Sequence, residues 1–362
     1  MNVLHVINDL RLAGAERLLA DLVEVQTVAG LTVSVAPLAP CGSANEAKIR
    51  DTGATLLLPD KRLAIRSPAQ IPRLRQLFRG YDLVHVQLFP AQLWVAIAGV
   101  SLGKAAPALL TTEQNTHNGR RDVPALKPID RWMYARYAGI AAISDGTRDA
   151  LIAYLPETAG KIMVVPNGID LRRFTQTGSL AERAALFPQV PASVPILLSV
   201  GRLEAQKDFG TLVRAVALVP DAHLCIVGDG HLRTPLETLA RTLGIAGRVH
   251  FLGKRNDIPA LLRNADMYTQ SSAWEGFGIA AVEAMASGLP LVVSDVPGLR
   301  EVVGDAVVTV APASPEAFAG AVNGLLKNAP RRAALSRLAR ARAARFSIAE
   351  TARGYADMYG RT

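Results

Sequence analysis

Short aliphatic runs alternate with helix-forming stretches along the whole chain, and no other feature limits the fold as strongly. One series of runs occupies the first half of the 362 residues and a second series the other half. Apolar runs between helices are typical of parallel strands that helices cover on both faces. The pattern predicts an α/β fold with two Rossmann-like domains, each with a doubly wound parallel sheet. The expected strands are residues 3–7, 32–36, 83–86, 108–110, 140–143 and 161–165, then 195–200, 223–227, 249–252, 267–270, 291–294 and 307–310.

The two domains are expected to meet within Val-Pro-Asn-Gly-Ile-Asp, residues 165–170, because proline and Asn-Gly mark a turn. The first domain then comprises residues 1–168 and the second residues 169–345. The chain is long enough for two separate cores, and its 50% of hydrophobic residues can fill them.

The formal net charge of +9 suits an anionic partner. Two basic clusters contain no acidic residue. The cluster at 61–79 mixes basic and apolar residues, which predicts contact with an anionic membrane surface. The cluster at 330–345 is expected to be a solvated helix face. A nucleic-acid partner is not expected, because only 5% of the residues are aromatic and none are interleaved with the basic runs for stacking.

The cysteine and hydropathy patterns predict a cytoplasmic protein. Cys41 and Cys225 fall in different predicted domains, so no disulfide framework is expected and a reducing compartment fits best. The run at 3–7 lacks a preceding basic region and is read as a strand, not as a secretory signal. The most apolar segment, 88–110, is interrupted by prolines and polar residues, so no membrane-spanning helix is expected. Any membrane association would then be peripheral, on the inner face.

The segment 265–295 reads as strand, loop, helix and strand, and it contains the strongest functional signal. Gly276 and Gly278 lie in a loop that leads into a helix expected at 279–287. A helix N-terminus presents unpaired N–H groups and the positive end of a dipole, which favours a bound phosphate. The glycines allow the backbone to approach a ligand closely.

Two glutamates, Glu275 and Glu283, flank this helix start. Carboxylates accept hydrogen bonds from sugar or ribose hydroxyl groups. Two acids beside a phosphate cradle predict a nucleotide-sugar pocket. The alternative is a solvated helix with two unrelated glutamates.

The sequence Glu-Gly-Phe-Gly-Ile-Ala-Ala-Val-Glu, followed by Ala-Met-Ala-Ser-Gly-Leu-Pro, resembles the E-x7-E element of retaining glycosyltransferases of family 4, also called group 1. The resemblance covers nearly the whole chain. It implies a GT-B fold, whose two domains face each other across a cleft, and a final helix within 346–362 that packs back on the first domain. It also implies that Glu275 holds the transferred sugar, that Glu283 holds the ribose, and that the donor is bordered by Gly276, Phe277, Gly278 and Ile279.

The sequence Val-Gly-Arg-Leu-x-x-x-Lys-Asp at 200–208 resembles the diphosphate-binding element of the same family. The resemblance implies that Gly201, Arg202 and Lys207 lie at the diphosphate. A guanidinium and an ammonium group there would stabilise the charge of the leaving group. Two exposed surface bases are the alternative reading.

Further donor contacts are expected along the second domain. Gly228 and Gly230 follow a strand and are expected to let a nucleotide approach. The resemblance places Arg255 near the donor base. In the first domain, Leu-Ala-Gly-Ala-Glu resembles a Gly-Gly-Ala-Glu element, which implies that Gly14 lies near the donor phosphates and the acceptor.

Polar residues at 111–121 follow a predicted strand, at the sheet edge where such folds bind ligands. They resemble the family pattern Thr-Glu-His-Asn-Thr-His-Asn, with Gln114 at the position of the first histidine. That histidine usually contacts the transferred sugar. Gln114 can donate and accept hydrogen bonds, but it cannot change charge. His117 is retained, either as a catalytic group or as a loop residue.

Neighbouring polar residues complete the prediction for the first domain. Asn115 is expected to contact the sugar or the acceptor. Arg120 and Arg121 would be solvated by default, with an acidic acceptor as the alternative. Ser144 or Asp145 is expected to cap a helix, and the resemblance also allows Ser144 a contact in the cleft.

The resemblance implies transfer of a sugar from a nucleoside-diphosphate sugar to a hydroxyl group, with retention at the anomeric carbon. A UDP-hexose or UDP-N-acetylhexosamine is the first donor expected, and GDP-mannose the second. The acceptor is expected to be a glycan or a polyprenyl-diphosphate-linked saccharide of bacterial surface polysaccharide synthesis. No cofactor or metal is expected, because the pocket segments lack an Asp-x-Asp or a histidine cluster. The alternatives are a nucleotide-sugar 2-epimerase of the same fold and a non-catalytic nucleotide-sugar-binding protein.

Overall fold

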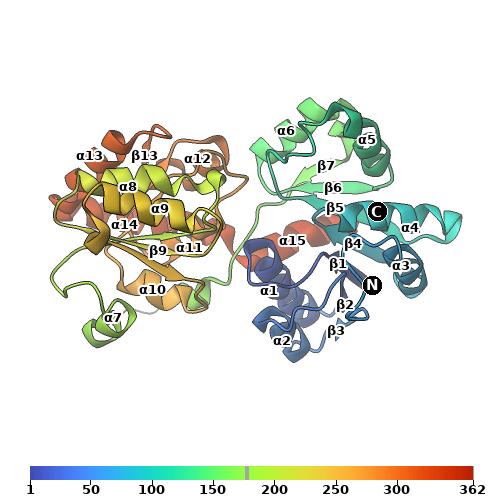
Figure 1. Ribbon diagram of the computed structural model, residues 1–362. Coiled ribbons are helices and arrows are strands. Elements are labelled where there is room, and N and C mark those ends of the chain that lie inside the picture. Colours follow the sequence, from blue (N-terminus) through green and yellow to red (C-terminus); the bar gives the residue numbers. More distant parts are fainter. Residues whose placement is uncertain (176–178, 362) are drawn as a thin grey trace. The chain divides into compact units, whose positions relative to one another are not determined.

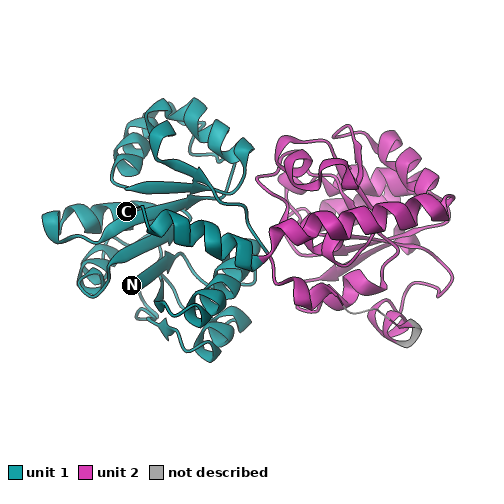
Figure 2. Ribbon diagram, turned by 180° about the vertical axis from the view of Figure 1, so that it is seen from behind, with its two compact units in different colours: residues 1–168, 348–362 teal, residues 169–347 magenta. Residues whose placement is uncertain are grey.

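The computed structural model describes residues 1–175 and 179–361, and these form two compact units (Figures 1 and 2). Unit 1 consists of residues 1–168 together with the C-terminal segment from residue 348, and unit 2 of residues 169–347. The C-terminal helix α15 (Ile348–Tyr359) therefore belongs to unit 1. Each unit has a parallel sheet with helices on both faces, as the sequence predicts (Figure 1).

The sheet of unit 1 has seven strands in its described part, in the order β3-β2-β1-β4-β5-β6-β7. The strand order reverses between β1 and β4, which makes a topological switch point where such sheets bind ligands. The two-residue strand β3 was not predicted. The strands are β1 (Asn2–Ile7), β2 (Thr32–Pro37), β3 (Thr55–Leu56), β4 (Leu83–Gln87), β5 (Ala108–Glu113), β6 (Gly139–Ala142) and β7 (Ile162–Val164).

Strand β5 is longer than the sequence suggests. It continues three residues beyond the predicted end at residue 110, and Thr111, Thr112 and Glu113 are buried in it. The prediction that they begin a loop is wrong, because their polar side chains are paired inside unit 1. The helices of unit 1 are α1 (Gly14–Val28), α2 (Ala44–Asp51), α3 (Gln70–Phe78), α4 (Ala91–Val100), α5 (Lys127–Ala135), α6 (Asp145–Tyr154) and α15.

Unit 2 has a sheet of six strands in its described part, in the order β10-β9-β8-β11-β12-β13. Its switch point lies between β8 and β11, where the two main predicted site loops begin. The strands are β8 (Ile196–Val200), β9 (His223–Val227), β10 (Val249–Gly253), β11 (Met267–Gln270), β12 (Leu291–Ser294) and β13 (Val308–Val310). The helices are α7 (Leu180–Leu186), α8 (Phe209–Ala217), α9 (Arg233–Thr242), α10 (Ile258–Asn264), α11 (Ile279–Ala286), α12 (Pro297–Val303), α13 (Pro315–Leu326) and α14 (Ala329–Ala343).

Among the described residues, none of the helices combines the length and the hydrophobicity that crossing a bilayer requires. In the basic cluster at 61–79, α3 turns its apolar side inward. Leu74 and Phe78 are buried in the core of unit 1, and Arg73 donates to the carbonyl oxygens of Pro37 and Leu57 at 3.2 and 2.6 Å. The exposed basic residues of this cluster are Lys61, Arg62, Arg66, Arg75 and Arg79, whereas its leucines, isoleucines and Phe78 are buried or half-buried.

The basic cluster at 330–345 is only partly solvated, which corrects the expectation. Three arginines of α14 donate to carbonyl oxygens at the ends of three other helices: Arg332 to Leu325 and Leu326 of α13, Arg340 to Ser287 after α11, and Arg342 to Glu301 and Val302 of α12. The last carbonyls of a helix lack backbone partners and carry the negative end of its dipole. These guanidinium groups therefore stabilise the packing of unit 2.

A buried polar network attaches α15 to the sheet of unit 1. His85 on β4 is hydrogen-bonded through Nδ1 to the Tyr359 hydroxyl at 2.8 Å and through Nε2 to Thr112 Oγ1 at 2.7 Å. The Tyr355 hydroxyl also lies 3.0 Å from Thr112 Oγ1. Burial lowers the pKa of His85 well below its ordinary value. The network therefore holds a neutral imidazole.

Acidification is expected to destabilise unit 1. Burial lowers the pKa of His5 from 6.5 to about 4, so the unfolded chain binds a proton that the folded chain excludes. Stability is then complete above pH 6.5 and falls as the pH drops toward about 4. In a His5→Gln variant, the fall of the free energy of unfolding with decreasing pH should become less steep by up to about 1.4 kcal/mol per pH unit. Hydrogen–deuterium exchange of the β1 peptide, followed as a function of pH, measures this dependence. The control His231→Gln, at an exposed site in unit 2, should leave the pH dependence unchanged.

Candidate functional site

The loops after β8 and β11 lie against each other in unit 2. The backbone N–H of Ala273 donates to the Gln206 carbonyl at 2.9 Å, and Ser271 Oγ donates to the carbonyls of Lys207 and Asp208 at 3.0 and 2.7 Å. The predicted cationic loop and the predicted E-x7-E loop are therefore neighbours, although they are far apart in the sequence.

Lys207 and Glu275 form an ion pair at this junction, with side chains only 18% and 10% exposed. The stem of Lys207 passes over Gly201, where a Cβ atom would lie 3.2 Å from Lys207 Cγ. The structure therefore brings together three of the predicted residues. An anionic ligand that reaches this ammonium group must share it with the Glu275 carboxylate.

Three residues that the sequence analysis missed hold this carboxylate. Gln270 Nε2 and Ser272 Oγ donate to Glu275 Oε2 at 3.0 and 3.2 Å, and the buried Tyr268 hydroxyl donates to Gln270 Oε1 at 3.1 Å. The available signal was a glutamine at the end of a short predicted strand. Buried polar groups need such partners, so the network fixes the orientation of Glu275.

Arg202 does not join the ion pair. Its Nη1 donates to Glu204 Oε1 at 2.7 Å, and its side chain is 65% exposed. Arg255 similarly pairs with Asp257, through Nε and Oδ1 at 2.8 Å. Both cations therefore lie at the surface of unit 2, each beside a neighbouring acid.

Gly228 and Gly230 are needed for packing between loops. A Cβ atom at Gly228, where φ is +136°, would lie 1.9 Å from the Gly201 carbonyl oxygen, and one at Gly230 would lie 2.5 Å from that of Leu203. The loop after β8 therefore gives both glycines a packing reason, and the expectation that they let a nucleotide approach stays a prediction.

Helix α11 begins as predicted, after Gly278 at a φ of +91°, and no side chain caps its first turn. Gly276 lies in the preceding loop, and the first helical residue, Ile279, is half-buried. Phe277 is buried and lies edge-on to Phe346, with ring centroids 5.4 Å apart, so its side chain belongs to the core.

Glu283 lies inside α11 and is buried. Burial raises the pKa of Tyr268, and the charges of Glu283 and Glu275 raise it further. Both predicted glutamates therefore lie near one buried tyrosine. Among the described residues, no group of three or more His, Cys, Asp or Glu side chains is placed to hold a metal ion.

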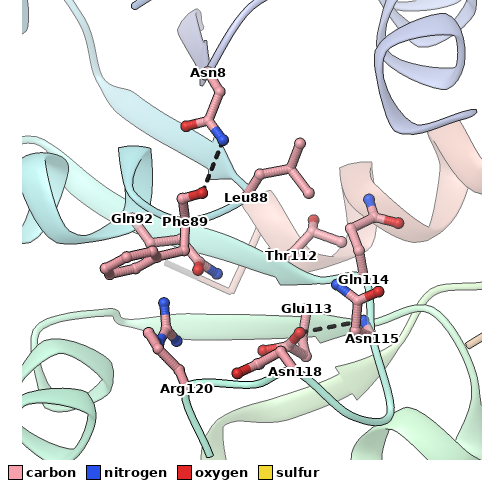
Figure 3. Close-up of a pocket in the computed structure, with 10 residues that line it drawn as sticks. All are labelled: Asn8, Leu88, Phe89, Gln92, Thr112, Glu113, Gln114, Asn115, Asn118 and Arg120. Atoms are coloured by element: carbon pink, nitrogen blue, oxygen red, sulfur yellow. Dashed lines mark hydrogen bonds between the residues drawn. The ribbon is translucent and has the colours of Figure 1, made fainter. Parts of the chain in front are cut away.

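Unit 1 has a pocket of about 280 Å³ at the ends of β4 and β5 (Figure 3). Gln114 and Asn115 line it, but His117 is not among the lining residues. His117 Nε2 lies 2.9 Å from Asp122 Oδ1, and its side chain is 52% exposed. The lining residues are Asn8, Leu88, Phe89, Gln92, Thr112, Glu113, Gln114, Asn115, Asn118 and Arg120.

The amide of Gln114 has a defined orientation. Its Nε2 donates to Gln87 Oε1 at 3.1 Å, and its Oε1 accepts from Asn167 Nδ2 at 3.2 Å. Gln87 and Asn167 are both buried. The sequence analysis missed both partners. Gln87 lies on β4, and Asn167 lies near the end of the first segment of unit 1.

Two further predicted residues have local roles. Ser144 is buried and accepts from the Thr147 N–H at 3.0 Å, which makes it the N-cap of α6 as expected. Gly14 is the exposed first residue of α1, and the preceding Ala13 provides no side-chain cap.

Two family models match the chain. The model for "Glycosyltransferase Family 4" matches residues 12–173, and the model for "Glycosyl transferases group 1" matches residues 186–342. Together they account for most of both units. The chain belongs to the family 4, group 1 glycosyltransferases.

Similar curated proteins have glycosyltransferase names. A lipopolysaccharide core biosynthesis glycosyltransferase of Rhizobium meliloti is 35% identical over 149 residues, 40% of this chain and 43% of that protein. The UDP-Gal:alpha-D-GlcNAc-diphosphoundecaprenol alpha-1,3-galactosyltransferase of Escherichia coli is 34% identical over 229 residues, 60% of this chain and 59% of that protein. The matches thus span about half the length of these relatives.

Among solved structures, Anabaena HepE in complex with UDP and glucose superposes with a TM-score of 0.86. The identity is 22%, and 99% of each chain is covered. This likeness concerns the fold, and it agrees with the two parallel sheets described above. The fold is GT-B.

Removal of Gln270 is expected to destabilise unit 2. A Gln270→Leu variant loses hydrogen bonds to Tyr268, Ser272 and Glu275 in the interior and should cost about 1–3 kcal/mol of the free energy of unfolding. Thr269→Val is the matched control on the same strand, because the buried Thr269 Oγ1 has no hydrogen-bond partner. Urea unfolding measures both variants, and equal losses would contradict the role of the network.

Proposed function

We propose that the chain transfers a sugar from a nucleoside-diphosphate sugar to a hydroxyl group of a glycan or lipid-linked acceptor, with retention. The observation that carries the proposal is the Lys207–Glu275 ion pair at the switch point of unit 2, which joins the loop after β8 to the loop that leads into α11. The names of the relatives support it. One relative uses a UDP-sugar and a lipid-linked acceptor, and HepE is bound to UDP and glucose.

In this proposal unit 2 binds the donor. The diphosphate gains negative charge as the bond to the sugar breaks, and stabilisation of that charge lowers the barrier. Lys207 and the uncapped N-terminus of α11 supply the positive potential. Arg202 adds a second cation, because its long exposed side chain can exchange Glu204 for a phosphate oxygen.

The remaining roles follow from the same assignment. Glu275, released in part from Lys207 by the diphosphate, accepts hydrogen bonds from the sugar hydroxyl groups. Glu283 accepts from the ribose. Unit 1 binds the acceptor in its pocket, with Gln114 and Asn115 on the lining. No metal or other cofactor takes part. A UDP-sugar is the first donor to test and GDP-mannose the second.

The place of action is proposed to be the inner face of a bacterial membrane. The exposed arginines at 61–79 would attract anionic lipids, while the buried apolar side of α3 contributes nothing to that contact. The reaction would extend a surface polysaccharide or glycoconjugate.

One experiment separates this proposal from its two rivals. The protein is incubated with UDP-sugars or GDP-mannose, with and without a detergent-solubilised lipid-linked acceptor, and nucleoside diphosphate and products are analysed. Acceptor-dependent release with an α-linked product from an α-linked donor supports the transferase. A free epimer formed without acceptor would indicate a 2-epimerase, and donor binding without any product would indicate a sensor.

Replacement of Lys207 is expected to abolish most turnover. Lys207→Ala removes a cation from the departing diphosphate and should lower kcat about 100-fold or more. Lys207→Arg keeps the charge and should recover part of the loss. Nucleoside diphosphate release measures both, and Lys327→Ala, at an exposed site after α13, is the control. A normal kcat for Lys207→Ala would remove this residue from the site.

Replacement of Glu283 is expected to weaken donor binding more than turnover. Glu283→Gln exchanges a charged hydrogen bond to the ribose, worth about 1.5–3 kcal/mol, for a neutral one worth about 0.5–1.5 kcal/mol, so the donor Kd should rise about tenfold. Calorimetric titration with UDP measures the Kd, and steady-state kinetics measure kcat. An unchanged Kd together with a reduced kcat would place Glu283 elsewhere.

A further inference from the structure

The charges in the unit 1 pocket are compensated by the protein itself. Arg120 lies over the ring of Phe89, with its Cζ 3.8 Å from the ring centroid (Figure 3). Its Nη2 lies 3.2 Å from Asp130 Oδ1. The side chains of Arg120 and Asp130 are 15% and 2% exposed. The side chain of Arg120 is therefore mostly shielded from solvent and its charge is balanced by Asp130, which corrects the expectation that Arg120 is solvated.

The carboxylate of the pocket is compensated in the same way. Glu113 Oε2 lies 3.0 Å from Arg121 Nη2, and both side chains are less than a tenth exposed. The Tyr134 hydroxyl donates to the same oxygen, and the Asn115 N–H donates to Oε1 at 3.2 Å. The two arginines and the two acids thus form two neutral pairs, and Asp130, Tyr134 and both pairings escaped the sequence analysis.

The other polar lining groups are neutral amides and a hydroxyl. Two buried atoms of lining residues have no hydrogen-bond partner: the acceptor Asn118 Oδ1 and the donor Arg120 Nε. Figure 3 shows both side chains on the same side of the pocket. A hydroxyl group both donates and accepts, so sugar hydroxyls satisfy atoms of both kinds.

We propose that the part of the acceptor that enters this pocket is an uncharged polyol ring, a sugar or cyclitol without phosphate, carboxylate or ammonium. The inference rests on the proposed function, because it specifies the acceptor of that reaction. A phosphate that accepted from Arg120 Nε would compete with Asp130 for the charge of the same guanidinium group and would lie beside the buried Glu113 carboxylate. Like charges placed together in a desolvated site repel each other strongly.

The size of the pocket limits the occupant to about one ring. Its 280 Å³ lies just below the range of about 300–1,000 Å³ that is usual for small-molecule pockets. Any charged or lipid part of the acceptor therefore stays outside this pocket. Phe89, which is 41% exposed, gives apolar surface that the C–H groups of a sugar ring can contact.

The test compares matched ligands on the intact chain. Methyl glycosides of glucose, galactose, mannose and N-acetylglucosamine, and myo-inositol, are each paired with a monophosphate or uronate counterpart. Saturation-transfer NMR measures binding, and nucleoside diphosphate release from UDP-sugars measures acceptor use. At least one neutral ring should bind about tenfold or more tightly than its charged counterpart.

A charge change in the pocket gives a second arm. Asp130→Asn leaves Arg120 without a counter-charge and should raise the affinity for the phosphorylated member about tenfold. The double replacement Arg120→Gln with Asp130→Asn removes the whole pair and should keep the preference for the neutral ring. Asp149→Asn, at an exposed site on α6, should change neither affinity. Thermal unfolding identifies variants that fail to fold, and the comparison on the unaltered chain needs no variant.

The outcomes separate this inference from the proposed function. Equal or tighter binding of the charged members to the unaltered chain would overturn it, and so would the absence of binding by every neutral ring. Nucleoside diphosphate release that depends on a phosphorylated ring would support the transferase but contradict the neutral acceptor. Binding of neutral rings without nucleoside diphosphate release from any donor would support the neutral occupant of the pocket but contradict the transferase.

Discussion

The ion pair between Lys207 and Glu275 is the interaction on which the arrangement of the unit 2 site depends. It joins the loop after β8 to the loop after β11, and the same carboxylate is held by Gln270 and Ser272. A buried pair of charges stabilises a structure only when its remaining hydrogen-bonding capacity is also satisfied. Gln270 and Ser272 satisfy part of that capacity at the Glu275 carboxylate, and the pair keeps a cation beside the loop before α11.

Local compensation of charge recurs throughout the protein. Arg120 and Arg121 are paired with buried acids in unit 1, and three arginines of α14 are bound to carbonyl groups at the ends of three helices. A formal net charge of +9 therefore overstates the positive surface available to partners. For the same reason a basic residue in a predicted site cannot be assigned to a phosphate before its acidic neighbours are known.

The sequence predicted the elements better than the contacts. Aliphatic runs located most strands, because parallel strands covered on both faces must be apolar along their length. It failed at β3, which has only two residues, and at the end of β5, where buried polar residues resemble a loop. His117 follows Gln114 by three positions, yet only Gln114 reaches the pocket, because the chain leaves the sheet after residue 113.

The amino-acid sequence by itself determined the two α/β units and the glycine-bounded start of α11, because these depend on local periodicity and backbone conformation. The tertiary structure alone decided which charges meet. Lys207 and Glu275 are 68 positions apart, and the partners of Gln114 lie 27 positions before it and 53 after it. Such pairings depend on the order of strands in the sheet, which places the ends of distant segments side by side and which no local pattern encodes.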